Sequence, residues 1–243
     1  MYRSCALAVL VLGTCWMTAL AQGGGGDPDA KGTVSITVEV KNGVTTVTAT
    51  RAASQGWTTG GVTIFGIDPN GGYIYYQLVP FTSKNPNTGS VELPLPNGTF
   101  DVWAAHTVVE NSPGTGNQTV ASALSSVTVA NSVSPAVTPG GSITCVPVRV
   151  SGGAGFQASG SYSYLTGWGD EPDNKWVYFD AMPTGGGVIR RLGVKDSLDG
   201  TWKTAPSTLY VPSQLKYNCW ASRAIAKPNG PGQAIGSAWQ KDK

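Results

Sequence analysis

The chain is short of charge, of histidine and of long apolar runs, and each shortage excludes a class of function. Charged residues make up 12% of the sequence, with 16 Lys and Arg against 14 Asp and Glu. Because they form no dense basic stripe, we expect no nucleic-acid partner. His106 is the one histidine, which excludes a multi-histidine metal site, and we expect neither a metal nor a cofactor. No apolar stretch reaches the roughly 20 residues of a membrane-spanning helix, so we expect no transmembrane segment.

The first residues have the three-part pattern of a secretory signal peptide. Arg3 gives a positive start, an apolar run follows, and residues 19–21 are small or apolar residues of the kind found before a cleavage site. We therefore expect residues 1–21 to be removed and the protein to be secreted, periplasmic or on the cell surface. The rival interpretation is lipid attachment at Cys15, but Thr14 stands where a lipoprotein signal usually has Ala, Gly or Ser.

The composition favours strands joined by turns, because Gly, Pro, Thr, Ser and Val are abundant and no window shows a helical period. Residues 22–32 are predicted to be a flexible Gly-rich leader. Asn42 and Gly43 predict a tight hairpin turn, since both tolerate positive φ. The first half, residues 33–131, contains strand patterns at 33–40, 43–50, 60–67, 72–79, 90–95, 99–109 and 118–130.

A second set of strands follows a Ser/Pro/Gly-rich segment, residues 132–141, which we expect to be a semi-rigid linker. The second half, residues 142–241, contains strand patterns at 142–150, 155–164, 174–182, 186–194, 200–204, 207–211, 215–226 and 233–240.

The two halves look like copies of one another. Matching features occur in the same order at offsets of roughly 110 to 117 residues, which indicates a duplicated domain. They include Gly56-Trp57 with Gly167-Trp168, Pro69 with Pro183, and Trp103 with Trp220.

The number and spacing of strands in each half resemble those of bacterial immunoglobulin-like and fibronectin type III-like domains. The resemblance covers both halves and implies an all-β chain. It would contain two tandem immunoglobulin-like antiparallel β-sandwiches after a signal peptide, each with its own core.

The repeat provides an internal control for candidate chemistry. His106 is matched by Arg223 in the second copy, and an arginine does not transfer protons near neutral pH. We therefore interpret both as polar residues near a strand end. Without a coherent acid, base and nucleophile set, a hydrolase is the least favoured function.

Two cysteines, Cys145 and Cys219, lie outside the expected signal peptide. In an exported chain they favour a disulfide. Cys219 is matched by Val102, which predicts a buried position. The alternation of Val146 and Val148 predicts that Cys145 faces the opposite side from them, so two free buried thiols are the alternative.

The loop GWGDEPDNKW, residues 167–176, is elaborated only in the second copy. Its carboxylates lack the spacing of a known calcium loop, which favours a solvated acidic loop. Its tryptophans could stack on sugar rings. We therefore predict a ligand site at Trp168, Trp176, Asp170 and Asp173.

These observations predict an exported, non-catalytic binding module whose partner is an extracellular carbohydrate or a cell-surface protein. The oligomeric state stays open. The alternative is an architectural spacer or adhesion component of a cell-surface assembly.

Overall fold

The structure is a computed structural model and describes residues 19–21, 27–112, 116–172, 175–195, 200–228 and 230–242. Within these ranges all regular structure is β-strand, and every strand pairing is antiparallel. The all-β class expected from the sequence is therefore confirmed. The described residues include no helix that could cross a membrane. Most of the expected signal peptide, the Gly-rich part of the leader, and Asp173 lie outside the described residues.

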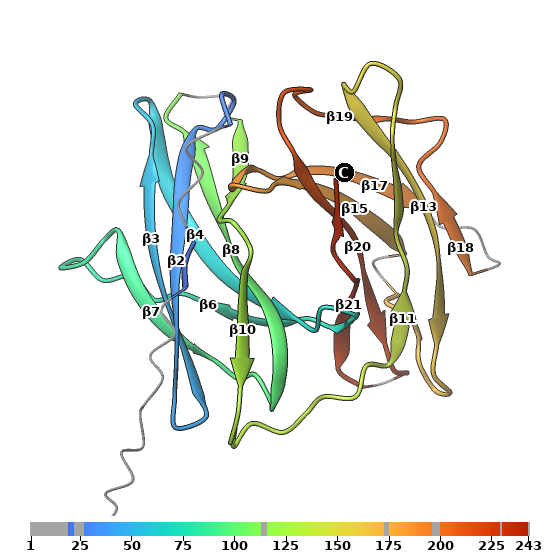
Figure 1. The fold of residues 1–243 in the computed structure, drawn as a ribbon, viewed down its shortest axis with the longest axis horizontal. Coiled ribbons are helices and arrows are strands. Elements are labelled where there is room, and N and C mark those ends of the chain that lie inside the picture. Colours follow the sequence, from blue (N-terminus) through green and yellow to red (C-terminus); the bar gives the residue numbers. More distant parts are fainter. Residues whose placement is uncertain are drawn as a thin grey trace, which may run out of the picture.

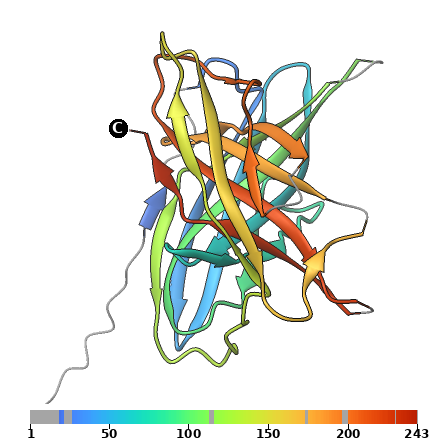
Figure 2. The same cartoon turned by 90° about the vertical axis from the view of Figure 1, so that its right-hand side faces the viewer.

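The strands form four sheets that follow one another across the molecule (Figure 1), and Figure 2 views the molecule from the side of the last sheet. Sheet A contains β1 (Ala19–Ala21), β2 (Gly32–Lys41), β3 (Val44–Ala53) and β7 (Thr88–Leu93). Sheet B contains β4 (Trp57–Ile67), β6 (Tyr75–Leu78), β8 (Gly98–Glu110), β9 (Asn117–Ala121), β10 (Ser125–Val129) and β16 (Gly187–Val188).

Sheet C contains β5 (Gly71–Tyr73), β14 (Gly169–Asp170), β15 (Trp176–Pro183), β17 (Arg190–Lys195), β20 (Tyr217–Ala226), β21 (Gly232–Ser237) and β22 (Gln240–Lys241). Sheet D contains β11 (Gly141–Ile143), β12 (Val146–Arg149), β13 (Gly155–Tyr164), β18 (Thr201–Lys203) and β19 (Leu209–Tyr210).

Each outer sheet packs on an inner sheet through an apolar core. Alternate residues of a strand point to one face, and in β2 the inward set is Val34, Ile36 and Val38, none more than 2% exposed. These side chains join the core between sheets A and B. Phe179 and Tyr217 belong to the corresponding core between sheets C and D.

Two bent segments join the inner sheets at both edges. Residues 71–78 form β5, which pairs with β21 of sheet C, and then β6, which pairs with β4 of sheet B. Residues 187–195 form β16, which pairs with β9 of sheet B, and then β17, which pairs with β15 of sheet C. Ile74 and Ile189 lie at the bends and donate backbone hydrogen bonds to β21 and β9, at 3.0 and 2.9 Å. Sheets B and C therefore form one closed ring of strands (Figure 1).

Both bent segments begin with the same pair of glycines. Gly71 and Gly72 have φ of 88° and 132°, and Gly186 and Gly187 have φ of 84° and 139°. Side chains with a Cβ rarely adopt these angles, so glycine is required for the chain to enter the neighbouring sheet. The same turn therefore precedes the crossing strand in each half.

The turns also adjust the predicted match between the halves by one residue. The Gly71 N–H donates to the Asp68 carbonyl, and the Gly186 N–H donates to the Pro183 carbonyl. Asp68, rather than the neighbouring Pro69, is thus the counterpart of Pro183.

The segments expected to be flexible or to act as spacers make specific contacts. Asp27, within the expected leader, is buried and pairs with Arg190 at 2.9 Å. In the expected linker, the Gly140 N–H donates to Gln233 Oε1 at 2.8 Å and the Val137 N–H donates to the Tyr75 hydroxyl at 3.3 Å. The linker segment is therefore attached to both halves.

Candidate functional site

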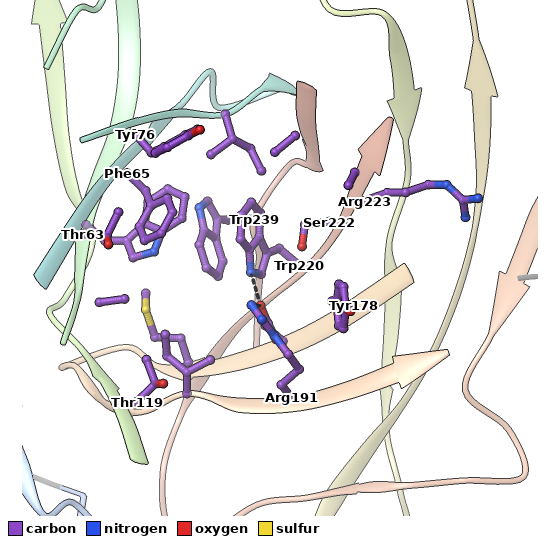
Figure 3. A pocket seen from close by; sticks show the side chains of 18 of the residues that line it. Thr63, Phe65, Tyr76, Thr119, Tyr178, Arg191, Trp220, Ser222, Arg223 and Trp239 are labelled. Carbon is purple, nitrogen blue, oxygen red and sulfur yellow. Dashed lines mark hydrogen bonds and ion pairs between the residues drawn. The ribbon is translucent and has the colours of Figure 1, made fainter. Parts of the chain in front are cut away.

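The ring of strands contains a cavity of about 700 Å³ between sheets B and C (Figure 3). One face of the inner strands packs on an outer sheet and the other face lines the cavity. In β4, Ile64 faces the outer core and its neighbour Phe65 lines the cavity. In β8, Val102 faces the outer core and Trp103 lines the cavity. Strand alternation therefore places one set of side chains in the cores and the other around the cavity.

Packed aromatic side chains lie at the centre of the closed ring of strands. Trp220 and Trp239 are stacked, with centroids 4.8 Å apart and planes inclined by 19°. Trp103 meets both edge-on at 5.1 Å and stacks with Phe65 at 5.3 Å. Trp103 and Trp220 are buried, whereas Phe65 and Trp239 are half-buried and still present surface. Each such pair contributes about 0.5–1.5 kcal/mol beyond burial, so these rings hold the two halves together as well as lining the cavity.

One side of the cavity carries an ion pair. Asp180 is 2% exposed and lies opposite Arg191 in the β15–β17 register. Arg191 donates from Nε to Oδ1 at 2.7 Å and from Nη2 to Oδ2 at 2.8 Å, and Trp220 Nε1 donates to Oδ2 at 3.2 Å. The hydrogen bonds to Asp180 raise the pKa of Arg191 above its usual value and outweigh the opposing effect of its partial burial. Asp180 and Arg191 have opposite formal charges, so this salt bridge adds no net charge to the cavity.

The equivalent positions of the other half carry aromatic rings. Tyr76 follows the bend at Ile74 by two residues, as Arg191 follows the bend at Ile189, and Tyr76 lies opposite Phe65 in its register. Figure 3 shows Tyr76 and Arg191 on opposite sides of the stacked tryptophans. At these equivalent positions the first half thus contributes aromatic rings and the second half an ion pair, while Trp220 and Trp239 of the second half add aromatic surface between them.

The residues predicted for ligand binding lie elsewhere, and none of the described ones lines the cavity. Trp168 is half-buried against Gly140, where an added Cβ would lie 2.1 Å from the indole, and Lys227 Nζ lies 5.0 Å from its ring. Trp176 is 44% exposed on β15. The structure does not bring these two tryptophans into the cavity.

Asp170, the third described member of that predicted site, belongs to an internal network. It accepts a hydrogen bond from Arg223 Nη2 at 2.6 Å and another from the Tyr164 hydroxyl. Burial alone would raise the pKa of Asp170, but the hydrogen bonds from Tyr164 and Arg223 outweigh it and lower the pKa. This carboxylate already has internal partners.

His106 and Arg223 are buried core residues, which corrects the interpretation of both as polar residues near a strand end. They are 0% and 1% exposed. His106 Nδ1 lies 3.2 Å from the Thr33 carbonyl oxygen, and burial lowers the pKa of His106. The Arg223 guanidinium lies 4.3 Å above the Tyr162 ring. Each side chain packs toward the outer sheet of its own half.

The expected disulfide between Cys145 and Cys219 is not formed. Both are buried free thiols in the core between sheets C and D. The strand breaks between β11 and β12, and Cys145 faces inward while Val146 and Val148 are 57% and 60% exposed. Cys145 does face away from the valines, as the alternation predicts, but the valines are the residues in solvent. Burial raises the pKa of Cys145 to about 12 and also raises that of Cys219.

The sequence did not single out Asp180, Arg191 or Phe65. The sequence signal for Tyr76 and Arg191 is their position after a glycine turn. The segments GGYIYYQ and GGGVIRRL contain equivalent turns, and they place Tyr76 and Arg191 at the same distance from the bend.

Neither potential metal ligands nor comparisons with known proteins assign a function to this site. Within the part of the chain that the structure describes, no three His, Cys, Asp or Glu side chains are grouped to hold a metal ion. No family model matches the chain, and comparisons with curated proteins and with solved structures gave no match.

Proposed function

We propose that this chain is an exported binding protein of two immunoglobulin-like sandwiches, and that a small ligand binds in the cavity between sheets B and C. The observation that carries the proposal is a cavity of about 700 Å³ that is lined by aromatic side chains from both halves and by the Asp180–Arg191 ion pair of the second half. Binding pockets for small molecules have this size and this mixture of apolar surface with a few oriented polar groups.

The state of the ion pair favours binding over hydrolysis. Asp180 is held by Arg191 through two hydrogen bonds and by Trp220 through a third. Hydrolysis needs an acid, a base and a nucleophile placed within reach of one another. A carboxylate paired in this way serves instead as a fixed polar surface for a ligand.

The size of the cavity favours a small ligand over a cell-surface protein. Protein partners cover on the order of 800 Å² of exposed surface per side, whereas this site is a cavity of about 700 Å³ between two sheets. Export is inferred from residues 1–21. Cleavage after Ala21 would remove β1 (Ala19–Ala21) from the edge of sheet A, and mass measurement of the secreted protein tests it.

Filling the cavity tests the proposal. Ala105 is half-buried and lines the cavity, and the matched control Ala52 is exposed on β3. We expect binding, measured by tryptophan fluorescence against neutral, anionic and cationic sugars and a neutral aromatic compound, to be lost in Ala105→Trp and kept in Ala52→Trp. Thermal unfolding checks that both variants fold. Failure of every probe to bind the unchanged protein, or equal binding by both variants, contradicts the proposal.

A second location for the same function is the surface around Trp176, whose ring is 44% exposed. A ligand that loses affinity in Trp176→Ala but not in Ala105→Trp would place the site at that surface.

A further inference from the structure

We propose that the cavity takes a neutral saccharide, with the sugar ring against the aromatic side and its hydroxyls on the Asp180–Arg191 side. The inference rests on the proposed function, which places a ligand in the cavity, and it adds the chemical class of that ligand. It follows from three properties of the cavity. Its aromatic rings are partly exposed, its polar groups have hydrogen-bonding capacity left, and its ion pair carries no net charge.

The aromatic side offers rings that are not fully covered. Phe65 and Trp239 are half-buried, and Tyr76 is 58% exposed. The C–H face of a sugar ring packs well on a flat ring of this kind, and a tyrosine adds a hydroxyl that can donate or accept. A fully apolar ligand would leave the polar groups opposite without partners.

The ionic side has hydrogen-bonding capacity beyond its internal contacts. A guanidinium has five N–H donors, and Arg191 uses two of them on Asp180. Its side chain is 54% exposed. Asp180 is 2% exposed and already accepts three hydrogen bonds, so the remaining capacity of the pair is the N–H donors of Arg191. A sugar hydroxyl can accept such bonds.

Further hydroxyl groups line the same cavity. They belong to Thr63, Thr107, Thr119 and Ser222, which come from β4, β8, β9 and β20. Each supplies one donor and two acceptor positions and carries no charge. These groups provide neutral polar contacts around the ion pair.

The balance of charge selects a neutral ligand. The charges of Asp180 and Arg191 cancel within the pair. Arg223 contributes atoms to the lining, but its guanidinium points away from the cavity (Figure 3) and binds Asp170. A charged ligand would give up hydration without meeting an uncompensated opposite charge. A cavity of about 700 Å³ has room for one or two sugar rings.

Matched sugars test the charge argument directly. In the gluco, galacto and manno series, the neutral hexose, its uronic acid and its 2-amino sugar share one ring and differ mainly in charge. We expect a neutral member, or a neutral disaccharide built from it, to bind about tenfold or more tightly than its two charged counterparts by titration calorimetry. Equal or tighter binding of a charged member overturns the inference.

Exchanging the walls tests the polar side. Asp180→Phe with Arg191→Tyr gives the second half the residues of the first. We expect at least about a tenfold loss of neutral-sugar affinity while a neutral aromatic probe still binds. Arg191→Gln, a milder change at a half-exposed side chain, should lose affinity similarly. Arg149→Gln is its control, because Arg149 pairs with Asp242 at 2.7 Å outside the cavity.

The two proposals fail differently. Binding of only the aromatic probe, abolished by Ala105→Trp, leaves the cavity as the ligand site and overturns the saccharide assignment. Sugar binding that survives both polar-side variants also overturns it. Absence of binding by every probe overturns both.

Discussion

The carboxylate of Asp27 is paired with the guanidinium of Arg190, which donates to it at 2.9 and 3.2 Å, and the Val188 N–H adds a third hydrogen bond at 2.9 Å. Burial alone would raise the pKa of Asp27, but these hydrogen bonds and the charge of Arg190 outweigh it and lower the pKa. The segment before β2 is thereby attached to the crossing strand β16–β17. It therefore stabilises the closure of the ring at that edge.

Asp27→Asn removes the charge from this buried pair. We expect it to lower the free energy of unfolding by about 2–4 kcal/mol, because Arg190 would stay buried without full compensation. Asp29→Asn is the control, since Asp29 pairs with the same Arg190 at 2.7 Å from an exposed position and should cost about 1 kcal/mol or less. Urea denaturation measures both. Equal losses of unfolding free energy in the two variants would show that the buried Asp27–Arg190 contact stabilises the fold no more than the exposed Asp29–Arg190 contact does.

The glycines at the start of the crossing strands should tolerate no side chain. Gly71→Ala and Gly186→Ala would each place a Cβ on a positive-φ backbone, 2.8 Å from Ala238 N or 2.7 Å from the Ala121 carbonyl oxygen. We expect each to cost about 1–3 kcal/mol of stability, as local backbone strain does.

Gly185→Ala is the matched control for these two variants. An added Cβ there meets nothing within 4 Å, so we expect a change within about 0.5 kcal/mol. A neutral effect of Ala at both crossing positions would contradict the role of these turns in closing the ring.

Stability should fall in mild acid because of His106. Burial lowers the pKa of this group in the folded state, while the unfolded chain takes up a proton near pH 6.5. Below that pH the unfolded state binds more protons, so the free energy of unfolding should decrease by about 1–2 kcal/mol between pH 7 and pH 5. Urea titrations at both pH values measure the slope. His106→Gln should remove most of it, and an unchanged slope in that variant would assign the effect to other groups.

The thiols of Cys145 and Cys219 should be inert in the native protein. Both are buried, and their raised pKa values leave almost no thiolate at pH 8. We expect iodoacetamide to label neither in the folded state and both after denaturation without reductant, as mapped by peptide mass spectrometry. Peptides that stay unlabelled until a reductant is added would instead show that the two cysteines are bonded.

Local sequence patterns identified strands with one exposed face. β2 and β3 alternate buried and exposed positions, and the Asn42-Gly43 turn between them has the predicted positive φ values of 52° and 78°. Alternation of this kind is visible in a sequence because solvent and core select different side chains. The all-β class follows from it.

The candidate site could not be predicted from the sequence because β20, one of the strands that form it, lacks such alternation. β20 is buried on both faces, so YNCWASRAIA shows no alternation that separates its core residues from those facing the cavity. Closure of the ring depends on β5 pairing with β21, far away in the chain, and a short Gly-Gly-Tyr strand does not specify its partner. Trp168 and Asp170 were predicted to bind a ligand. In the structure Trp168 packs against Gly140 and Lys227, and Asp170 pairs with Arg223.

The reciprocal crossing of β5–β6 and β16–β17 gives each half the geometry of a subunit in a symmetric dimer that exchanges one strand. In a dimer of identical chains, a residue on one wall of a shared cavity must occur on the other wall as well. Joining both copies in one polypeptide removes that restriction. Phe65 with Tyr76 can then face Asp180 with Arg191 across a single cavity, and the site can distinguish the two ends of a ligand that has no symmetry of its own.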